Sequence, residues 1–199
     1  MRKHAVHDKI AWIINGSGGH TLMKIALGKK PVFAFGLALG LLGLTASPSL
    51  SQELIEEKSL PLSLAQKAAN VAREKCEADG YKISVAVVDA GGNLRALVRG
   101  DGAGPHTIDS SSKKAYTASS LRRPTRELAE LIVKNPAVQA LGRMNDKILI
   151  LGGGLPIKFG DAVLGGIGVG GAPGGHLDEA CAVEGLKSIG ASVPGEKKE

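Results

Sequence analysis

Two imidazole side chains stand where glycine-rich loops lead into expected helices. They belong to His106 and His176, and the carboxylate of Glu179 follows the second within one helical turn. Imidazole and carboxylate groups bind transition metals, but neither histidine has the His-x-x-His or His-x-x-x-His spacing of a closed zinc site. Two interpretations stay open. One is an open metal site that uses His106, His176 and Glu179, and the other is exposed histidines without a role.

Basic side chains gather around the helix expected over residues 108–120. Guanidinium and ammonium groups bind carboxylates well. A cationic rim for the carboxylates of a ligand is therefore one interpretation, and a solvated face is the other. The candidate ligand-binding cations are Arg99, Lys114 and Arg122, with Lys113 and Arg123 beside them.

A glycine pattern near the end of the chain imitates a nucleotide-binding motif. Gly166-x-Gly168-x-x-Gly171 matches Gly-x-Gly-x-x-Gly between an expected strand and helix. A dinucleotide fold also needs a following parallel strand and an acidic residue about 20 positions on, and the remaining sequence predicts neither. We therefore expect these glycines to let the last strand pack closely. No Gly-x-Ser-x-Gly nucleophile motif accompanies them.

The charge of the chain is concentrated near its start. Residues 1–51 hold six Lys/Arg and one acidic residue, whereas residues 52–199 hold 19 Lys/Arg and 18 acidic residues. Without a clustered basic face in the second part, nucleic-acid binding is not expected. Residues 23–51 resemble a signal peptide, because lysines precede the apolar run 31–44, which is short for a membrane span.

We therefore interpret 1–22 as an upstream extension and 23–51 as a cleaved signal peptide, with an uncleaved membrane anchor as the alternative. The single domain would be 52–199, with its core about 60–191. The mature protein would be periplasmic or secreted, without a membrane anchor after cleavage. Cys76 and Cys181 lie on apolar helical faces, so a disulfide and two buried free thiols are both compatible with the sequence.

Apolar periodicity and turn residues predict an α+β layered domain. Its sheet would be mainly antiparallel, because hairpin turns dominate. The expected helices cover residues 63–79, 108–120, 125–132 and 177–189, and the five expected strands cover 83–89, 94–99, 147–151, 155–159 and 162–170. The small inward residues Ser111, Ser112 and Ala115 would admit another backbone, another subunit or a flat ligand.

Several blocks in the same order resemble the GlcG/HbpS family, over roughly residues 60–191. They are Val87–Leu94, Asp101–Ala103, Lys113–Ala118, Arg122–Thr125, Gly153–Ile157, Gly165–Gly170 and Asp178–Ala182. Members of this family are small haem-binding or haem-degrading-type proteins, and the domain is also fused to some corrinoid adenosyltransferases. Asn93 and Gly100 stand where the family often has His and Met, so these two positions supply no imidazole or thioether ligand.

The resemblance implies a GlcG-like, profilin-like fold and a homo-oligomer, an octamer in the best-known case. It implies an exported haem- or tetrapyrrole-binding protein, accessory in one type to redox sensing. His106 or His176 would ligate or flank the iron, and Arg99, Lys114 or Arg122 would meet the propionates. The alternatives are an enzyme that degrades haem or acts on a small organic acid, and a structural or signalling oligomer without ligand. Binding ranks above catalysis, because no coupled acid–base pair is evident.

Overall fold

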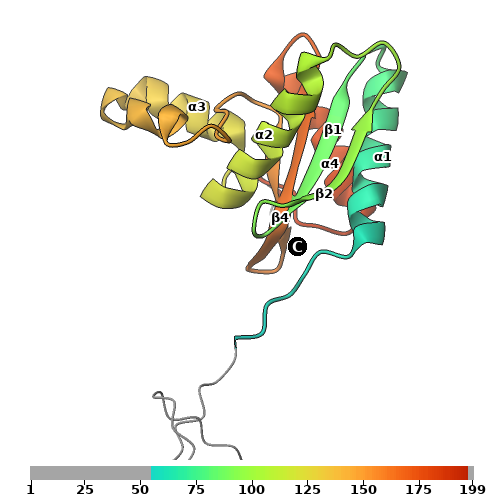
Figure 1. The fold of residues 1–199 in the computed structure, drawn as a ribbon, viewed down its shortest axis with the longest axis horizontal. Coiled ribbons are helices and arrows are strands. Elements are labelled where there is room, and N and C mark those ends of the chain that lie inside the picture. The colour runs from blue at the N-terminus through green and yellow to red at the C-terminus, as the bar shows by residue number, and fades with distance from the viewer. Residues whose placement is uncertain (1–54, 197–199) are drawn as a thin grey trace, which may run out of the picture. The chain divides into compact units, whose positions relative to one another are not determined.

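Helices cover both faces of a small sheet in this protein, which is described by a computed structural model over residues 55–196. Figure 1 shows α2 on one face of the sheet and α1 with α4 on the other. This arrangement confirms the α+β layered prediction. The elements are α1 (Leu62–Ala78), β1 (Ser84–Asp89), β2 (Leu94–Arg99), α2 (His106–Leu121), α3 (Thr125–Lys134), the 3-10 helix η1 (Pro136–Arg143), β3 (Gly154–Phe159), β4 (Ala162–Gly170) and α4 (Gly175–Ser188).

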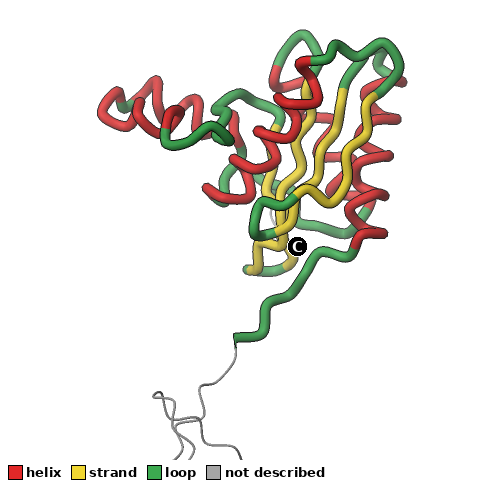
Figure 2. Tube along the Cα trace, in the orientation of Figure 1, coloured by secondary structure: helices red, strands yellow, loops and turns green. Residues whose placement is uncertain are grey.

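The four strands form an antiparallel sheet in the order β2-β1-β4-β3. Figure 2 shows them as neighbouring yellow segments of the tube between the helices. β1 is central and buried along nearly its whole length, which explains why its sequence is continuously apolar. The β1–β2 turn is fixed by Asp89, whose carboxylate accepts a hydrogen bond from the backbone N–H of Asn93 at 2.9 Å.

The predicted fifth strand over residues 147–151 is wrong. This segment is irregular, although Ile148 within it is buried. The backbone N–H of Leu149 donates to the hydroxyl of Thr117 on α2 at 2.8 Å. A helix side chain therefore supplies the hydrogen bond that a strand neighbour would have given, and the apolar run packs without joining the sheet.

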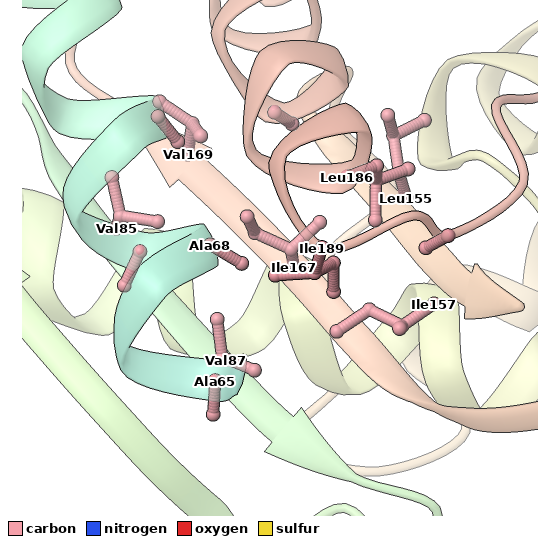
Figure 3. Packing of buried hydrophobic residues seen from close by; sticks show 14 of the residues in the cluster. Ala65, Ala68, Val85, Val87, Leu155, Ile157, Ile167, Val169, Leu186 and Ile189 are labelled. Carbon is pink, nitrogen blue, oxygen red and sulfur yellow. The ribbon is translucent and has the colours of Figure 1, made fainter. Parts of the chain in front are cut away.

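The main core lies between the sheet and the α1–α4 pair. Figure 3 shows strand residues such as Val85, Val87 and Ile167 directed at Ala68 of α1 and Leu186 of α4. Alternate strand positions face this layer, as the two-residue period of a strand requires. The close approach of α1 and α4 depends on small residues, because a Cβ at Gly185 would lie 2.6 Å from the carbonyl oxygen of Ala68.

The opposite face of the sheet is lined by glycine, and α2 packs on it backbone to backbone. A Cβ at Gly166 would lie 2.2 Å from the carbonyl oxygen of Ala115, and one at Gly168 would lie 2.2 Å from that of Ser111. Ser111 and Ala115 are therefore used within the domain, because strand β4 packs against the backbone of α2 at these two positions. Ser112 is only partly buried and does not take part in this contact.

Replacing Gly168 with alanine is expected to lower the free energy of unfolding by about 1–3 kcal/mol, because the new methyl group overpacks the α2–β4 contact. Urea denaturation measures the loss. Gly142→Ala is the matched control, since a Cβ there meets nothing within 4 Å. Equal unfolding midpoints for Gly168→Ala and the wild-type protein would contradict this account.

Cys76 of α1 and Cys181 of α4 form a disulfide across the core layer, with their Cα atoms 5.5 Å apart. The sequence left the pairing open. The structure decides it, because the two helices lie side by side and bring the thiols within bonding distance.

The expected leader, residues 1–51, lies outside the described part of the chain. Within residues 55–196, no helix is long and apolar enough to span a membrane. The α3–η1 segment makes few contacts with the sheet and extends as an arm from the layered body (Figure 1).

Candidate functional site

Both candidate histidines lie at one end of the sheet. Ser84 at the start of β1 is paired with Arg99 on one side and Gly170 on the other. The loop after Arg99 leads to His106 at the start of α2, and the loop after Gly170 leads to His176 at the start of α4. We call this region the Ser84 end. Arg99 lies at the end of β2 there, and His106 and His176 begin the two helices that follow the loops from β2 and β4.

A glycine two residues before each histidine leaves room for its imidazole ring beside the loop. A Cβ at Gly104 would lie 2.6 Å from Cε1 of His106, and a Cβ at Gly174 would lie 2.7 Å from Cε1 of His176. Each ring therefore lies over the glycine two residues before it, and both histidines are exposed to solvent. Exposed imidazole nitrogens are accessible to a metal or a ligand.

Arg99 is exposed and held in place by the loop that follows it. Its Nε donates to the carbonyl oxygen of Ala103 at 2.9 Å, and its terminal nitrogen bonds the same oxygen. Beside it lies a cleft of about 500 Å³, lined also by Lys82 and Asp101. Arg99 keeps guanidinium donors for a carboxylate, as the sequence suggests.

Arg122 lies at the opposite end of α2 from His106. The two are 16 residues apart, which is about 24 Å along the helix at 1.5 Å per residue. This separation is too large for both side chains to contact one small ligand. Arg122 also has a left-handed backbone conformation, with φ of 55°, where α2 ends. It therefore stays a candidate for a separate anion and does not join the Ser84 end.

Lys114 has a place that the sequence did not predict. Its side chain is 2% exposed, and its ammonium donates to the carboxylate of Asp178 at 2.7 Å and to the carbonyl oxygen of Val169 at 2.9 Å. Gly153 makes room, because a Cβ there would lie 3.1 Å from Nζ of Lys114. The expected contact with a propionate is replaced by a buried ion pair that joins α2 to α4.

Burial raises the pKa of Asp178 above 3.8, because removal from water disfavours the charged carboxylate. The charge of Lys114 and the hydrogen bond from the N–H of Ala172 at 3.0 Å act in the opposite direction. The folded domain therefore holds the Asp178 proton to higher pH than the unfolded chain does. The stability from this group is fully present below pH 3.8 and is lost as the pH rises through the folded-state pKa.

The carboxylate of Glu179 is occupied by a salt bridge. Both of its oxygens accept hydrogen bonds from the guanidinium of Arg126 at 3.1 Å, which ties α4 to α3. Among residues 55–196, no three His, Cys, Asp or Glu side chains are grouped so that they could hold a metal ion. The open three-ligand site of His106, His176 and Glu179 is therefore not assembled among the described residues.

Sequence reasoning missed a cleft between α2 and the β1–β2 hairpin. It has a volume of about 400 Å³ and includes Leu94, Lys113, Tyr116 and Lys147. The sequence gave part of the evidence for this cleft, since the spacing of Lys113 and Tyr116 places both on one flank of α2. The contribution of Lys147 was not visible, because the chain returns to α2 only after η1.

Comparison with known proteins shows where this fold occurs. The sequence profile described as "Haem degrading protein HbpS-like" matches residues 60–187. The crystal structure of a double mutant of HbpS from Streptomyces reticuli is similar at 43% identity and a TM-score of 0.64, over 71% of this chain and 96% of that one.

Two further proteins are similar to this chain. The Klebsiella pneumoniae protein ORFY is 30% identical with a TM-score of 0.67, over 73% of this chain and all of that one. Protein GlcG of Escherichia coli is 29% identical over 110 residues, which are 55% of this chain and 80% of GlcG. These matches confirm the resemblance and the fold class, with four strands in place of five. The chain belongs to the HbpS-like family of haem-degrading-type proteins.

Proposed function

We propose that this protein is an exported, oligomeric haem-binding protein in which a histidine at the Ser84 end would hold the haem iron. The observation that carries the proposal is the position of exposed His106, exposed His176 and Arg99 at the same end of the sheet in a domain of the HbpS-like family. Imidazole suits haem iron, and a guanidinium suits a propionate. The haem group, when bound, supplies the redox-active iron, and the chain supplies the ligand and the cations.

Two features support the export and the assembly in this proposal. The Cys76–Cys181 disulfide favours an oxidising compartment, such as the periplasm or the outside of the cell. Val133, Met144 and Leu151 in and after the α3–η1 arm are large apolar residues that are half or more exposed. Exposed apolar surface of this kind favours contact with another subunit.

Haem titration of the purified protein tests the binding. We expect a Soret shift with the wild-type protein, and about a tenfold or greater rise in Kd for either His106→Ala or His176→Ala, because one of them loses the axial bond. The histidine whose loss leaves Kd unchanged is the matched control for the other. Light scattering on the same sample measures the subunit number, for which we expect eight.

An unchanged absorbance spectrum on addition of haem would overturn the proposal. Equal affinity of both histidine variants and the wild-type protein would overturn the axial role of these residues.

The family description favours a second candidate, which is oxidative breakdown of haem. Adding a reductant and oxygen to the haem-loaded protein separates the two. Binding alone leaves the porphyrin absorbance stable, whereas degradation replaces it with that of a ring-opened product. The ion pair of Lys114 and Asp178 is buried, so it offers no acid–base pair to a substrate at the surface.

A further inference from the structure

A second cleft, of about 400 Å³, lies where α2 ends, at the opposite end of this helix from His106. Three segments that are distant in the sequence form its walls. They are the turn between α2 and α3, the edge strand β3, and residues 192–195 after α4. The volume lies within the range of pockets that bind small organic molecules.

Hydrogen bonds between these segments fix the walls of the cleft. The backbone N–H of Gly154 on β3 donates to the hydroxyl of Thr125, the first residue of α3, at 2.8 Å. The backbone N–H of Ser192 donates to the carbonyl oxygen of Lys158 on β3 at 2.8 Å. Both neighbouring segments are therefore tied to the same strand, and the cleft is formed before a ligand arrives, which favours binding.

Basic side chains border this cleft. Arg122 and Arg123 come from the turn, Lys158 comes from β3, and Glu127 adds one carboxylate. Within residues 55–196, none of the three cations forms a salt bridge. This holds for Arg122 even though acidic residues line the neighbouring cleft that it also borders. The surplus of positive charge is thus available to an anion.

Apolar residues supply another part of the lining. Pro156 borders the cleft from the same face of β3 as Lys158, because strand residues two positions apart share a face. Val193 and Pro194 border it from the segment after α4. An inorganic ion would leave these apolar surfaces in water, whereas the carbon atoms of an organic anion would cover them. Guanidinium groups suit its acidic groups, since they bind carboxylates and phosphates through paired hydrogen bonds.

The backbone of Arg122 gives an independent reason to connect this residue with binding. Its φ of 55° is the one positive φ of a non-glycine residue in the described part of the chain. Glycine is the usual residue in the left-handed conformation after a helix, because a Cβ is unfavourable there. Residues held in such conformations cluster at binding sites. An internal salt bridge does not explain this arginine among the described residues, and a ligand would.

We propose that this cleft binds a small organic anion that carries two or more carboxylate or phosphate groups. Arg122 and Arg123 bind one acidic group, Lys158 binds another, and Pro156 and Val193 contact the carbon atoms between them. The site lies about 24 Å along α2 from His106 at 1.5 Å per residue, so it is separate from the Ser84 end. The proposal does not rest on the haem function.

Isothermal titration calorimetry of the purified protein at low ionic strength tests the cleft, with citrate and fructose 1,6-bisphosphate as probes. The first carries carboxylates and the second carries phosphates, so the tighter binder identifies the preferred acidic group. We expect Arg123→Glu and Lys158→Glu each to raise the Kd of that probe about tenfold or more, because the charge is reversed. Arg95→Glu is the matched control, since Arg95 is exposed on β2, at the opposite edge of the sheet.

Arg122→Gly separates binding from folding. Glycine adopts the left-handed conformation without strain, so we expect a urea midpoint at least equal to that of the wild-type protein. The Kd of the anion should nevertheless rise about tenfold, because one guanidinium is lost. The proposal is overturned if neither probe binds the wild-type protein, or if the three cleft variants bind the probes as the wild-type protein does.

Discussion

Replacing Lys114 with methionine is expected to lower the free energy of unfolding by about 3–5 kcal/mol, which is the usual cost of removing one partner of a buried ion pair. The substitution keeps most of the apolar stem but leaves the carboxylate of Asp178 without its cation. It also removes the donor to the carbonyl oxygen of Val169. Urea denaturation at neutral pH measures the loss.

Lys113→Met is the matched control, because Lys113 is the neighbouring residue on α2 and its ion pair with Asp109 is exposed. Exposed pairs of this kind contribute about 0.3–0.5 kcal/mol. The double variant Lys114→Met, Asp178→Leu should recover much of the loss, since it leaves no buried charge. Equal unfolding midpoints for Lys114→Met and Lys113→Met would show that the buried pair does not stabilise the fold.

The Lys114→Met variant should also change how the free energy of unfolding depends on pH. Lys114 is the largest influence that lowers the pKa of Asp178, so its loss should raise this pKa further above 3.8. The decline of stability with rising pH would then extend to higher pH than in the wild-type protein. NMR titration of the Asp178 carboxyl carbon measures the shift directly.

Removing the Cys76–Cys181 disulfide is expected to cost about 2–5 kcal/mol, since the bond joins residues 105 positions apart and restricts most of the unfolded domain. Both cysteines are fully buried, so the bond lies within the core between α1 and α4. The double variant Cys76→Ala, Cys181→Ala should unfold at lower urea concentration than the oxidised wild-type protein.

Reduced wild-type protein is the control for this variant, because reduction breaks the bond without changing side-chain volume. We expect it to lose stability in the same direction as the double alanine variant. Oxidised and reduced wild-type proteins with the same urea midpoint would contradict the structural role of the disulfide.

Local rules in the sequence were sufficient for most elements. The turn at Asp89 and Asn93, the four helices and the antiparallel hairpins follow from turn chemistry and apolar periodicity, which are short-range effects. The segment 147–151 shows the limit. Its apolar residues are typical of a strand, but the hydroxyl of Thr117, 32 positions from Leu149, satisfies the backbone instead.

The candidate site shows the same division. The residue types of His106, His176 and Arg99 were visible in the sequence, and so was their link to glycine-rich loops. The buried position of Lys114 was not visible in the sequence. A lysine on a polar helix is usually solvated, and the partner of Lys114, Asp178, is 64 positions away.

By itself, the sequence determined the family, the layered fold class and the residue types available for binding, because these depend on local patterns and ordered motifs. Only the tertiary structure decided which of those residues meet. It joined Cys76 to Cys181, buried Lys114 against Asp178, and separated Arg122 from His106 by the length of α2. It also brought Lys147 to Tyr116. These outcomes depend on long-range packing, which fixes distances between residues that no spacing along the chain specifies.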